Sequence, residues 1–152
     1  MPDKIVVKFK RLIEDLNDIP IPQYATTGSA GMDIRAALKQ NLILQPGQTE
    51  LIPTNLSVEI PQGYEIQVRP RSGLAIKHGV TILNSPGTID SDYRGEVKII
   101  LINHGKLPYT ITSGDRIAQL VLSKVHIAEL EESNKLNYSD RGEGGFGHTG
   151  KK

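Results

Sequence analysis

The sequence contains no cysteine, which excludes disulfide scaffolds, cysteine nucleophiles and zinc sites built on thiolates. It also lacks any apolar run approaching the roughly 18 residues of a membrane helix. Lysines interrupt the first ten residues every few positions, so the apolar core of a signal peptide is missing there. We therefore expect a cytoplasmic protein with no membrane partner.

A strong excess of charge of either sign is absent too. The chain has 18 basic and 17 acidic residues, which gives a formal net charge of +1. A dedicated nucleic-acid binder usually carries a marked basic excess or a basic stripe, so we expect no nucleic-acid partner. A small anionic ligand is compatible with this balance, because it needs only a few well-placed donors.

The apolar residues occur in short stretches, because 15 glycines and 9 prolines are spread over the 152 residues. In residues 55–60 and 64–69 apolar and polar side chains alternate, which predicts strands with one face on a core. Residues 97–102 and 117–121 are almost continuously apolar, as expected of strands buried on both faces. Short strands separated by turn signals indicate an all-β domain, a jelly-roll-like sandwich or barrel.

Three further segments complete the expected organisation. Residues 4–16 have apolar spacings that fit a helix or a strand, and we favour a strand; residues 74–78 could form one short helix. From residue 133 onward apolar residues nearly vanish, so this stretch cannot bury enough apolar surface to offset the entropy of ordering. We predict a β domain over residues 1–133 and a flexible, Gly-rich C-terminal arm over residues 134–152.

Residues 69–73 read Arg-Pro-Arg-Ser-Gly and combine donors suited to an anion. Arginine offers a charged planar fork, serine a hydroxyl, and glycine a backbone N–H that a ligand can approach closely. Amides of a helix starting at residue 74 would add to such a cradle. The same residues also fit a solvated turn with two surface arginines, and taken alone they leave both interpretations open.

Residues 87–95 read Gly-Thr-Ile-Asp-Ser-Asp-Tyr-Arg-Gly and join two apolar runs, which predicts a β-hairpin with its turn near residues 91–92. Aspartates in a turn usually serve only to form it, and this applies to Asp92. Asp90 differs because it follows Ile89 at the end of an apolar stretch, where a carboxylate would be less solvated. A partly desolvated carboxylate is suited to act as a general base.

Two more features admit a functional and an ordinary interpretation. Gln119 is a lone amide in an apolar strand, so it needs a hydrogen-bond partner, either in a neighbouring strand or in a ligand. In the C-terminal arm Phe146 is flanked by glycines and follows Arg141, which suits a closing lid, although the composition also fits a disordered tail. The chain has no Walker motif, and its histidines lack metal-ligand spacing.

Five segments, in this order, resemble the five motifs of the trimeric dUTPase family: residues 29–33, 70–75, 87–95, 114–120 and 141–150. One such motif would be weak evidence, whereas five in order at the family's spacing are highly specific. The resemblance implies a jelly-roll-like subunit in a homotrimer. Three active sites would each draw on all three chains, with the arm of one chain closing over a site on its neighbours.

The resemblance also implies hydrolysis of dUTP to dUMP and pyrophosphate, which keeps uracil out of DNA and supplies dUMP for thymidylate synthesis. Asp90 would be the general base that activates a water molecule for in-line attack on the α-phosphorus. The uracil and deoxyribose would be bound by Asn84, Thr88, Ile89, Asp90, Tyr93, Lys98 and Phe146. The phosphates would be bound by Arg71, Ser72, Gly73, Gln119, Arg141, Gly147 and Thr149.

In the same resemblance Mg²⁺ is held by the substrate phosphates and not directly by the protein. Asp33 either contributes to the metal through a water molecule or is structural, and we favour the structural role. Asn84 and backbone groups near Lys98 would read the uracil edge, while the Tyr93 ring would exclude a ribose. The rival interpretations are a dCTP deaminase of the same fold and a nucleotide-sensing protein without turnover.

Overall fold

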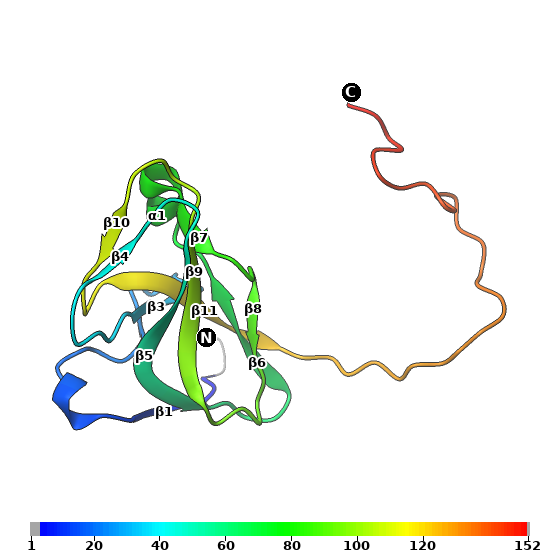
Figure 1. The fold of residues 1–152 in the computed structure, drawn as a ribbon. Helices are drawn as coiled ribbons and strands as arrows, with labels where there is room; N and C mark the ends of the chain where they lie inside the picture. The colour runs from blue at the N-terminus through cyan, green and yellow to red at the C-terminus, as the bar shows by residue number, and fades with distance from the viewer. Residues whose placement is uncertain (1–3, 152) are drawn as a thin grey trace.

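The computed structural model describes residues 4–151, and within them antiparallel strands build two larger sheets and one small one (Figure 1). The first sheet contains, in spatial order, β1 (Lys8–Arg11), β5 (Thr49–Glu59), β9 (Glu96–Asn103) and β7 (Val80–Ile82). The second contains β2 (Gln23–Tyr24), β3 (Met32–Arg35), β11 (Arg116–Lys124), β6 (Tyr64–Arg69) and β8 (Gly87–Ile89). The small sheet pairs β10 (Tyr109–Ile111) with β4 (Leu42–Leu44).

Side chains from both larger sheets meet in one hydrophobic core. Ile52 and Leu101 come from the first sheet, Ile66 and Leu120 from the second, and all four are 0% exposed. Burying one such side chain contributes about 1.5–3 kcal/mol, so this shared core holds the sheets together. The prediction of an all-β fold is confirmed.

The strand predictions hold best where one face is buried. In β6 the expected alternation is present, with Ile66 and Val68 buried and their neighbours more exposed. In β5 the polar face is buried as well, because Asn55 and Ser57 are 2% and 9% exposed. Asn55 is buried because its side chain accepts the N–H of Ile13 at 2.7 Å and donates to the carbonyl of Ile13 at 2.9 Å.

The expectation that residues 97–102 and 117–121 are buried on both faces is wrong for the single chain. In β9 only alternate residues are buried, and Ile100 and Ile102 are partly exposed. In β11 Gln119 and Val121 are partly exposed in the same way. The reason is that no further layer of the described chain covers the outer faces of the two sheets.

The two short-element predictions fare differently. The strand expected over residues 4–16 is found as β1 only, and a 3₁₀ helix, Glu14–Leu16, follows it. The predicted short helix is confirmed as α1 (Ser72–His78), which begins two residues earlier than expected and ends at Gly79. Gly79 has a φ of 67°, a left-handed conformation that glycine adopts without steric cost.

The predicted hairpin over residues 87–95 is wrong in its pairing. A turn does form, with the N–H of Tyr93 donating to the carbonyl of Asp90 at 3.2 Å. However, β8 pairs with β6 in the second sheet, whereas β9 pairs with β5 and β7 in the first. The connection therefore crosses between sheets. Burial against the shared core decides which partner each strand takes, and the local turn sequence does not specify that burial.

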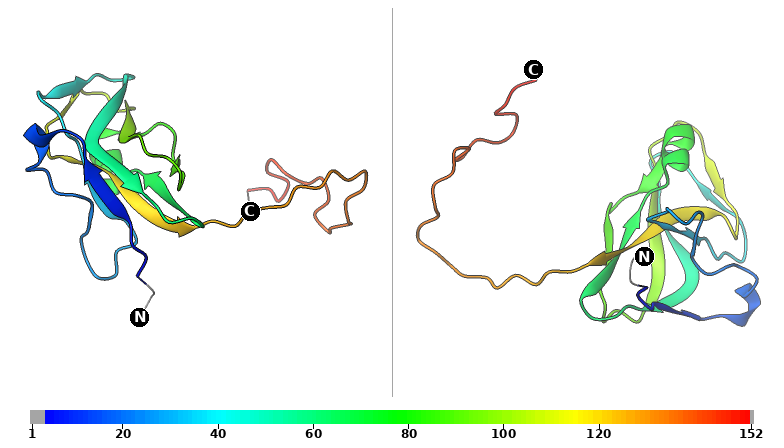
Figure 2. Two further views of the ribbon diagram at one scale, coloured as in Figure 1. Left: turned by 90° about the horizontal axis from the view of Figure 1, so that it is seen from below. Right: turned by 180° about the vertical axis from the view of Figure 1, so that it is seen from behind.

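After β11 ends at Lys124 the chain leaves the β domain and runs away from it (Figures 1 and 2). Residues 126–143 are exposed and form no helix or strand. In the described part of the chain the helical segments, of 3 and 7 residues, are too short to span a membrane.

Candidate active site

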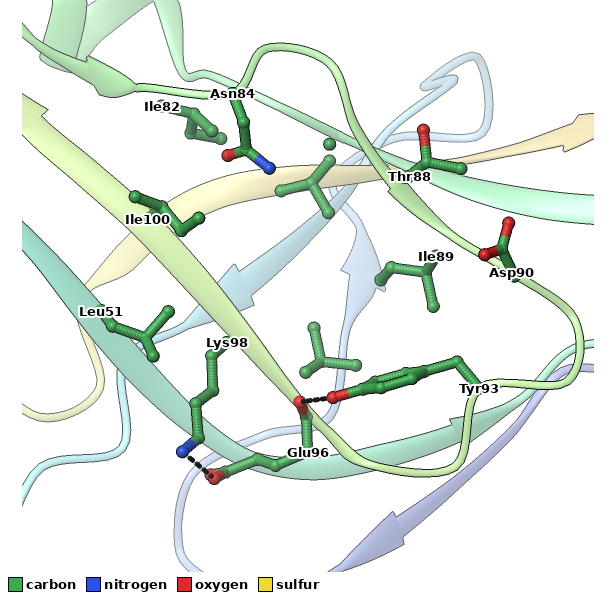
Figure 3. A pocket seen from close by; sticks show the side chains of 13 residues that line it. Leu51, Ile82, Asn84, Thr88, Ile89, Asp90, Tyr93, Glu96, Lys98 and Ile100 are labelled. Atoms are coloured by element: carbon green, nitrogen blue, oxygen red, sulfur yellow. Dashed lines mark hydrogen bonds and ion pairs between the residues drawn. The ribbon is translucent and has the colours of Figure 1, made fainter.

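A pocket of about 310 Å³ opens beside the connection between β8 and β9 (Figure 3). Side chains from β5 to β9 line it, so both sheets contribute to its walls. Its volume falls at the lower end of the range for small-molecule sites. Six residues predicted from the sequence line it together: Asn84, Thr88, Ile89, Asp90, Tyr93 and Lys98.

Tyr93 is fixed across one side of the pocket. Its hydroxyl donates to the backbone carbonyl of Glu96 at 2.9 Å, as Figure 3 shows. Beneath the ring, a Cβ on Gly95 would collide with the Tyr93 hydroxyl, so residue 95 has to be glycine for the ring to lie there. The side chain is still 46% exposed and can pack against a ligand.

Asn84 directs its amide into the other side of the pocket (Figure 3). Gly87 makes room for it, because a Cβ on Gly87 would lie 3.4 Å from Nδ2 of Asn84 and 3.2 Å from Cβ of Val68. A side-chain amide offers both a donor and an acceptor, so Asn84 can read one edge of a heterocyclic base. This wall is polar at one point and apolar around it.

Asp90 lies at the rim of the pocket, near Thr88 (Figure 3). Ile89 before it is buried, but Asp90 itself is exposed. The prediction of a less solvated carboxylate is therefore wrong for the single chain. The cause is the turn that starts at Asp90, which carries the chain from the core into solvent before β9 begins.

A second cluster forms around Asp33, which lies in β3. Its carboxylate lies between two arginines, with Oδ1 3.3 Å from Nε of Arg71 and Oδ2 3.3 Å from a guanidinium nitrogen of Arg116. Oδ1 has no hydrogen-bond partner among the described residues, so its contact with Arg71 is an ion pair without hydrogen-bond geometry. The Asp33 side chain is 13% exposed, which makes this pairing stronger than one in open solvent.

Gln119 lies on the same sheet face as Asp33, because the two residues are directly opposite in the β3–β11 ladder. Its amide packs on Gly31, where a Cβ would lie 3.1 Å from Oε1 of Gln119. Among residues 4–151 no hydrogen bond joins this amide to a neighbouring strand, and the side chain is partly exposed, so a ligand contact for Gln119 stays a prediction. Arg71, Asp33 and Gln119 are thus brought together.

Within one chain the pocket and this cluster remain separate. Arg71, Ser72, Gly73 and Gln119 do not line the pocket, although Ser72 and Gly73 are exposed at the start of α1. The remaining predicted residues lie on the extended arm, away from the β domain (Figure 2): Arg141, Phe146, Gly147 and Thr149. There Arg141 donates to the carbonyl of Gly144 at 2.6 Å.

Sequence reasoning missed several residues of the pocket. The most informative is Glu96, which starts the apolar strand β9 and shares its outer face with Lys98 and Ile100. The alternation of side chains along β9 puts Glu96 and Ile100 on the same face as the predicted Lys98, and this pattern could have identified both from the sequence. The other missed lining residues are Leu51, Val68, Ile82, Gly87 and Val97.

The dUTPase family model matches residues 17–150 of the chain. The chain belongs to the dUTPase family. A deoxyuridine 5'-triphosphate nucleotidohydrolase of Caldanaerobacter subterraneus is 52% identical over 146 residues, which cover 96% of this chain and 98% of that protein. One of Fusobacterium nucleatum is 56% identical over 133 residues, 88% of this chain and 91% of the relative.

Solved structures of dUTPases have the same fold. The Staphylococcus bacteriophage 80alpha dUTPase with dUPNHPP superimposes with a TM-score of 0.85 at 28% identity, covering 95% of this chain and 98% of that one. A variant of the dUTPase from phage phi11 of S. aureus, which shows the coordination of a structural Mg(II) ion, has a TM-score of 0.76 at 25% identity, covering 88% and 99%.

The charge pairing at Asp33 gives a first prediction for this dUTPase. Asp33→Asn removes the charge between two arginines and should lower the free energy of unfolding by about 1–2 kcal/mol, less than for a fully buried pair because Arg116 is nearly half exposed. Urea denaturation at fixed protein concentration measures it. Glu59→Gln, which breaks the exposed Lys8–Glu59 pair, is the control and should leave the midpoint unchanged. Equal midpoints for both variants would contradict a stabilising role for Asp33.

Proposed function

We propose that this dUTPase hydrolyses dUTP to dUMP and pyrophosphate in the pocket beside the β8–β9 connection, with Asp90 as the general base. The supporting observation is the convergence of an amide, an aromatic ring and a carboxylate on one nucleoside-sized space, from Asn84, Tyr93 and Asp90. Acting in the cytoplasm, the enzyme keeps uracil out of DNA and supplies dUMP for thymidylate synthesis.

The uracil ring occupies the wall formed by Asn84 and the backbone near Lys98. A site built to hydrogen-bond one edge rejects cytosine, because its polar groups would then be left unpaired. A narrow cleft at this wall leaves no room for the methyl group of thymine. Thr88 and Ile89 line the sugar, and the Tyr93 ring packs on the deoxyribose where a 2'-hydroxyl would collide.

Asp90 takes a proton from a water molecule as the oxygen of that water attacks the α-phosphorus. The bond from the α-phosphorus to the bridging oxygen breaks, and pyrophosphate leaves with the electron pair. A positioned general base contributes about 10²–10⁴ in rate, so orientation of the triphosphate and neutralisation of its charge supply the rest. Because Asp90 is exposed in the single chain, other parts of the assembly must cover it during the reaction.

We place the remaining phosphate-binding residues on other subunits of a homotrimer. Arg71, Ser72, Gly73 and Gln119 belong to a second chain, and Arg141, Gly147 and Thr149 to the arm of a third, in which Phe146 stacks over the uracil. The separation of these groups from the pocket within one chain supports this arrangement. The arrangement is also supported by two apolar side chains that the single chain leaves exposed, Leu51 at 53% and Phe146 at 115% relative exposure, since a neighbouring subunit or the substrate would cover them. The β domain then spans residues 1–133 and the closing arm residues 134–152, of which residues 1–3 and 152 lie outside the described residues.

Mg²⁺ would be bound mainly by the substrate. Among residues 4–151 no group of three or more His, Asp and Glu side chains is placed to hold a metal ion, and Asp33 already pairs with two arginines. When bound to the triphosphate oxygens, Mg²⁺ neutralises their charge and retains waters. The role of Asp33 in this proposal is to hold Arg71 in place.

A nucleotide panel tests the activity. Incubation with Mg²⁺ and dUTP, dCTP, dTTP or UTP should release pyrophosphate from dUTP alone. Only dUTP combines a base that pairs with Asn84 and a sugar that fits against the Tyr93 ring. Pyrophosphate release and base identity are followed for each nucleotide. Ammonia release from dCTP would indicate a deaminase instead, and tight dUTP binding without products would indicate a sensor.

The general base is tested by Asp90→Asn. This variant should lower kcat by about 10²–10⁴ and keep its affinity for a non-hydrolysable dUTP analogue, because the amide retains the shape of the side chain but takes up no proton. Asp92→Asn, in the same turn but outside the pocket, is the matched control and should retain full turnover. Normal turnover in Asp90→Asn would place the general base elsewhere.

The arm is tested by deleting residues 141–152. The shortened chain should lose activity by about 10²-fold or more, because triphosphate orientation and water exclusion are lost, while the trimer persists. Steady-state kinetics and sedimentation measure the two properties, and a chain lacking only residues 151–152 is the control. Full activity, or dissociation to monomers, would argue against a closing arm.

A further inference from the structure

We infer that Glu96 is a positioning residue that fixes the Tyr93 ring by tying β9 to an irregular stretch of β5. The inference rests on the proposed function, in which Tyr93 packs against the deoxyribose. Glu96 is partly buried, lines the pocket and makes contacts on two sides, with β5 and with the pocket.

On the β5 side the strand pairing is interrupted. Pro53 pairs with Lys98 and the next pair joins Ser57 with Glu96, so β5 advances four residues while β9 advances two. Such a bulge leaves backbone groups without ladder partners. Two side-chain bonds replace them: the Thr54 hydroxyl donates to the carbonyl of Val97 at 2.5 Å, and the N–H of Asn55 donates to Oε1 of Glu96 at 3.0 Å.

Asn55 itself is in an unusual conformation. Its φ is 61°, in the left-handed region, and it is 2% exposed. A non-glycine residue stays in that region only where its surroundings determine it strongly, and such strain tends to gather near functional sites. Here the surroundings are the backbone of Ile13 and the carboxylate of Glu96. Loss of the carboxylate would leave the buried N–H of Asn55 without a partner.

On the pocket side Glu96 meets two residues of the nucleotide wall. Its carbonyl accepts the Tyr93 hydroxyl at 2.9 Å, and its Oε2 lies 3.6 Å from Nζ of Lys98 (Figure 3). A shift of β9 at residue 96 would therefore move the oxygen that holds the ring. The ring cannot follow freely, because Gly95 lies against its hydroxyl end, where even a Cβ would collide.

This arrangement separates the role of Glu96 from that of Asp90. Glu96 holds the surface that touches the sugar and takes up no proton in the reaction. Its loss should weaken nucleotide binding and the rejection of a ribose while the chemical step is unchanged. This split between KM and kcat is the signature of a residue that acts through binding geometry.

Glu96→Ala should raise KM for dUTP about tenfold, change kcat less than about twofold, and lower the ratio of kcat/KM for dUTP to that for UTP by about tenfold. Glu96→Gln should recover most of the affinity and selectivity, because the amide oxygen can still accept the N–H of Asn55. The matched control is Glu59→Ala at the end of β5, which removes an exposed ion pair with Lys8 of β1 outside the pocket. It should retain wild-type kinetics.

The inference is overturned if Glu96→Ala lowers only the unfolding midpoint while KM and selectivity stay at wild-type values. It is also overturned if Glu59→Ala changes selectivity equally, or if Glu96→Gln is as defective as Glu96→Ala. Should Glu96→Ala fail to fold, Glu96→Gln is compared with wild type. A ratio of kcat/KM for dUTP to that for UTP close to the wild-type ratio supports the hydrogen bond from Asn55 to residue 96, and loss of this selectivity overturns the inference. Failure of the proposed function is distinct, because the wild-type enzyme would then not turn over dUTP.

Discussion

The connection between β8 and β9 has to cross from one sheet to the other, and the candidate nucleotide pocket lies beside this crossing. Each strand is held by its own sheet and by the shared core, so the connecting residues 90–95 must span the gap with little freedom. The turn at Asp90, the tight packing of Gly95 on Tyr93 and the bond from Tyr93 to Glu96 all follow from that constraint. The residues that line the pocket are therefore placed by the way the two sheets pack.

The outer faces of the two larger sheets are not covered by any further element of the described chain. The pocket walls that β5 and β9 contribute are therefore covered by no other element of the chain, and Asp90 is exposed as well because its turn leaves the core. The charged cluster of Asp33 with Arg71 and Arg116 lies apart from the pocket, and the arm extends away from both. In the trimer that we propose, a site divided in this way would become complete only when chains associate, and activity would then depend on assembly.

Much of the fold could be predicted from the sequence. The alternation in residues 64–69, the short helix after Arg71 and the turns between strands are local properties of the chain, and the structure has them. Six predicted residues line the pocket because they lie close together along the chain, between Asn84 and Lys98. The burial of Asn55 could not be predicted, because the partner that satisfies its side chain, Ile13, is 42 residues away.

By itself the sequence determined which residues are candidates to meet a uracil nucleotide, because these candidates lie in short segments whose side chains and turns are set locally. The tertiary structure decided which sheet each strand joins, so the expected hairpin became a crossing between sheets. It also decided that Asp33 pairs with two arginines and that Glu96 supports a bulge in β5. These contacts join residues 38 to 83 positions apart, and only packing on a common core brings such distant groups together.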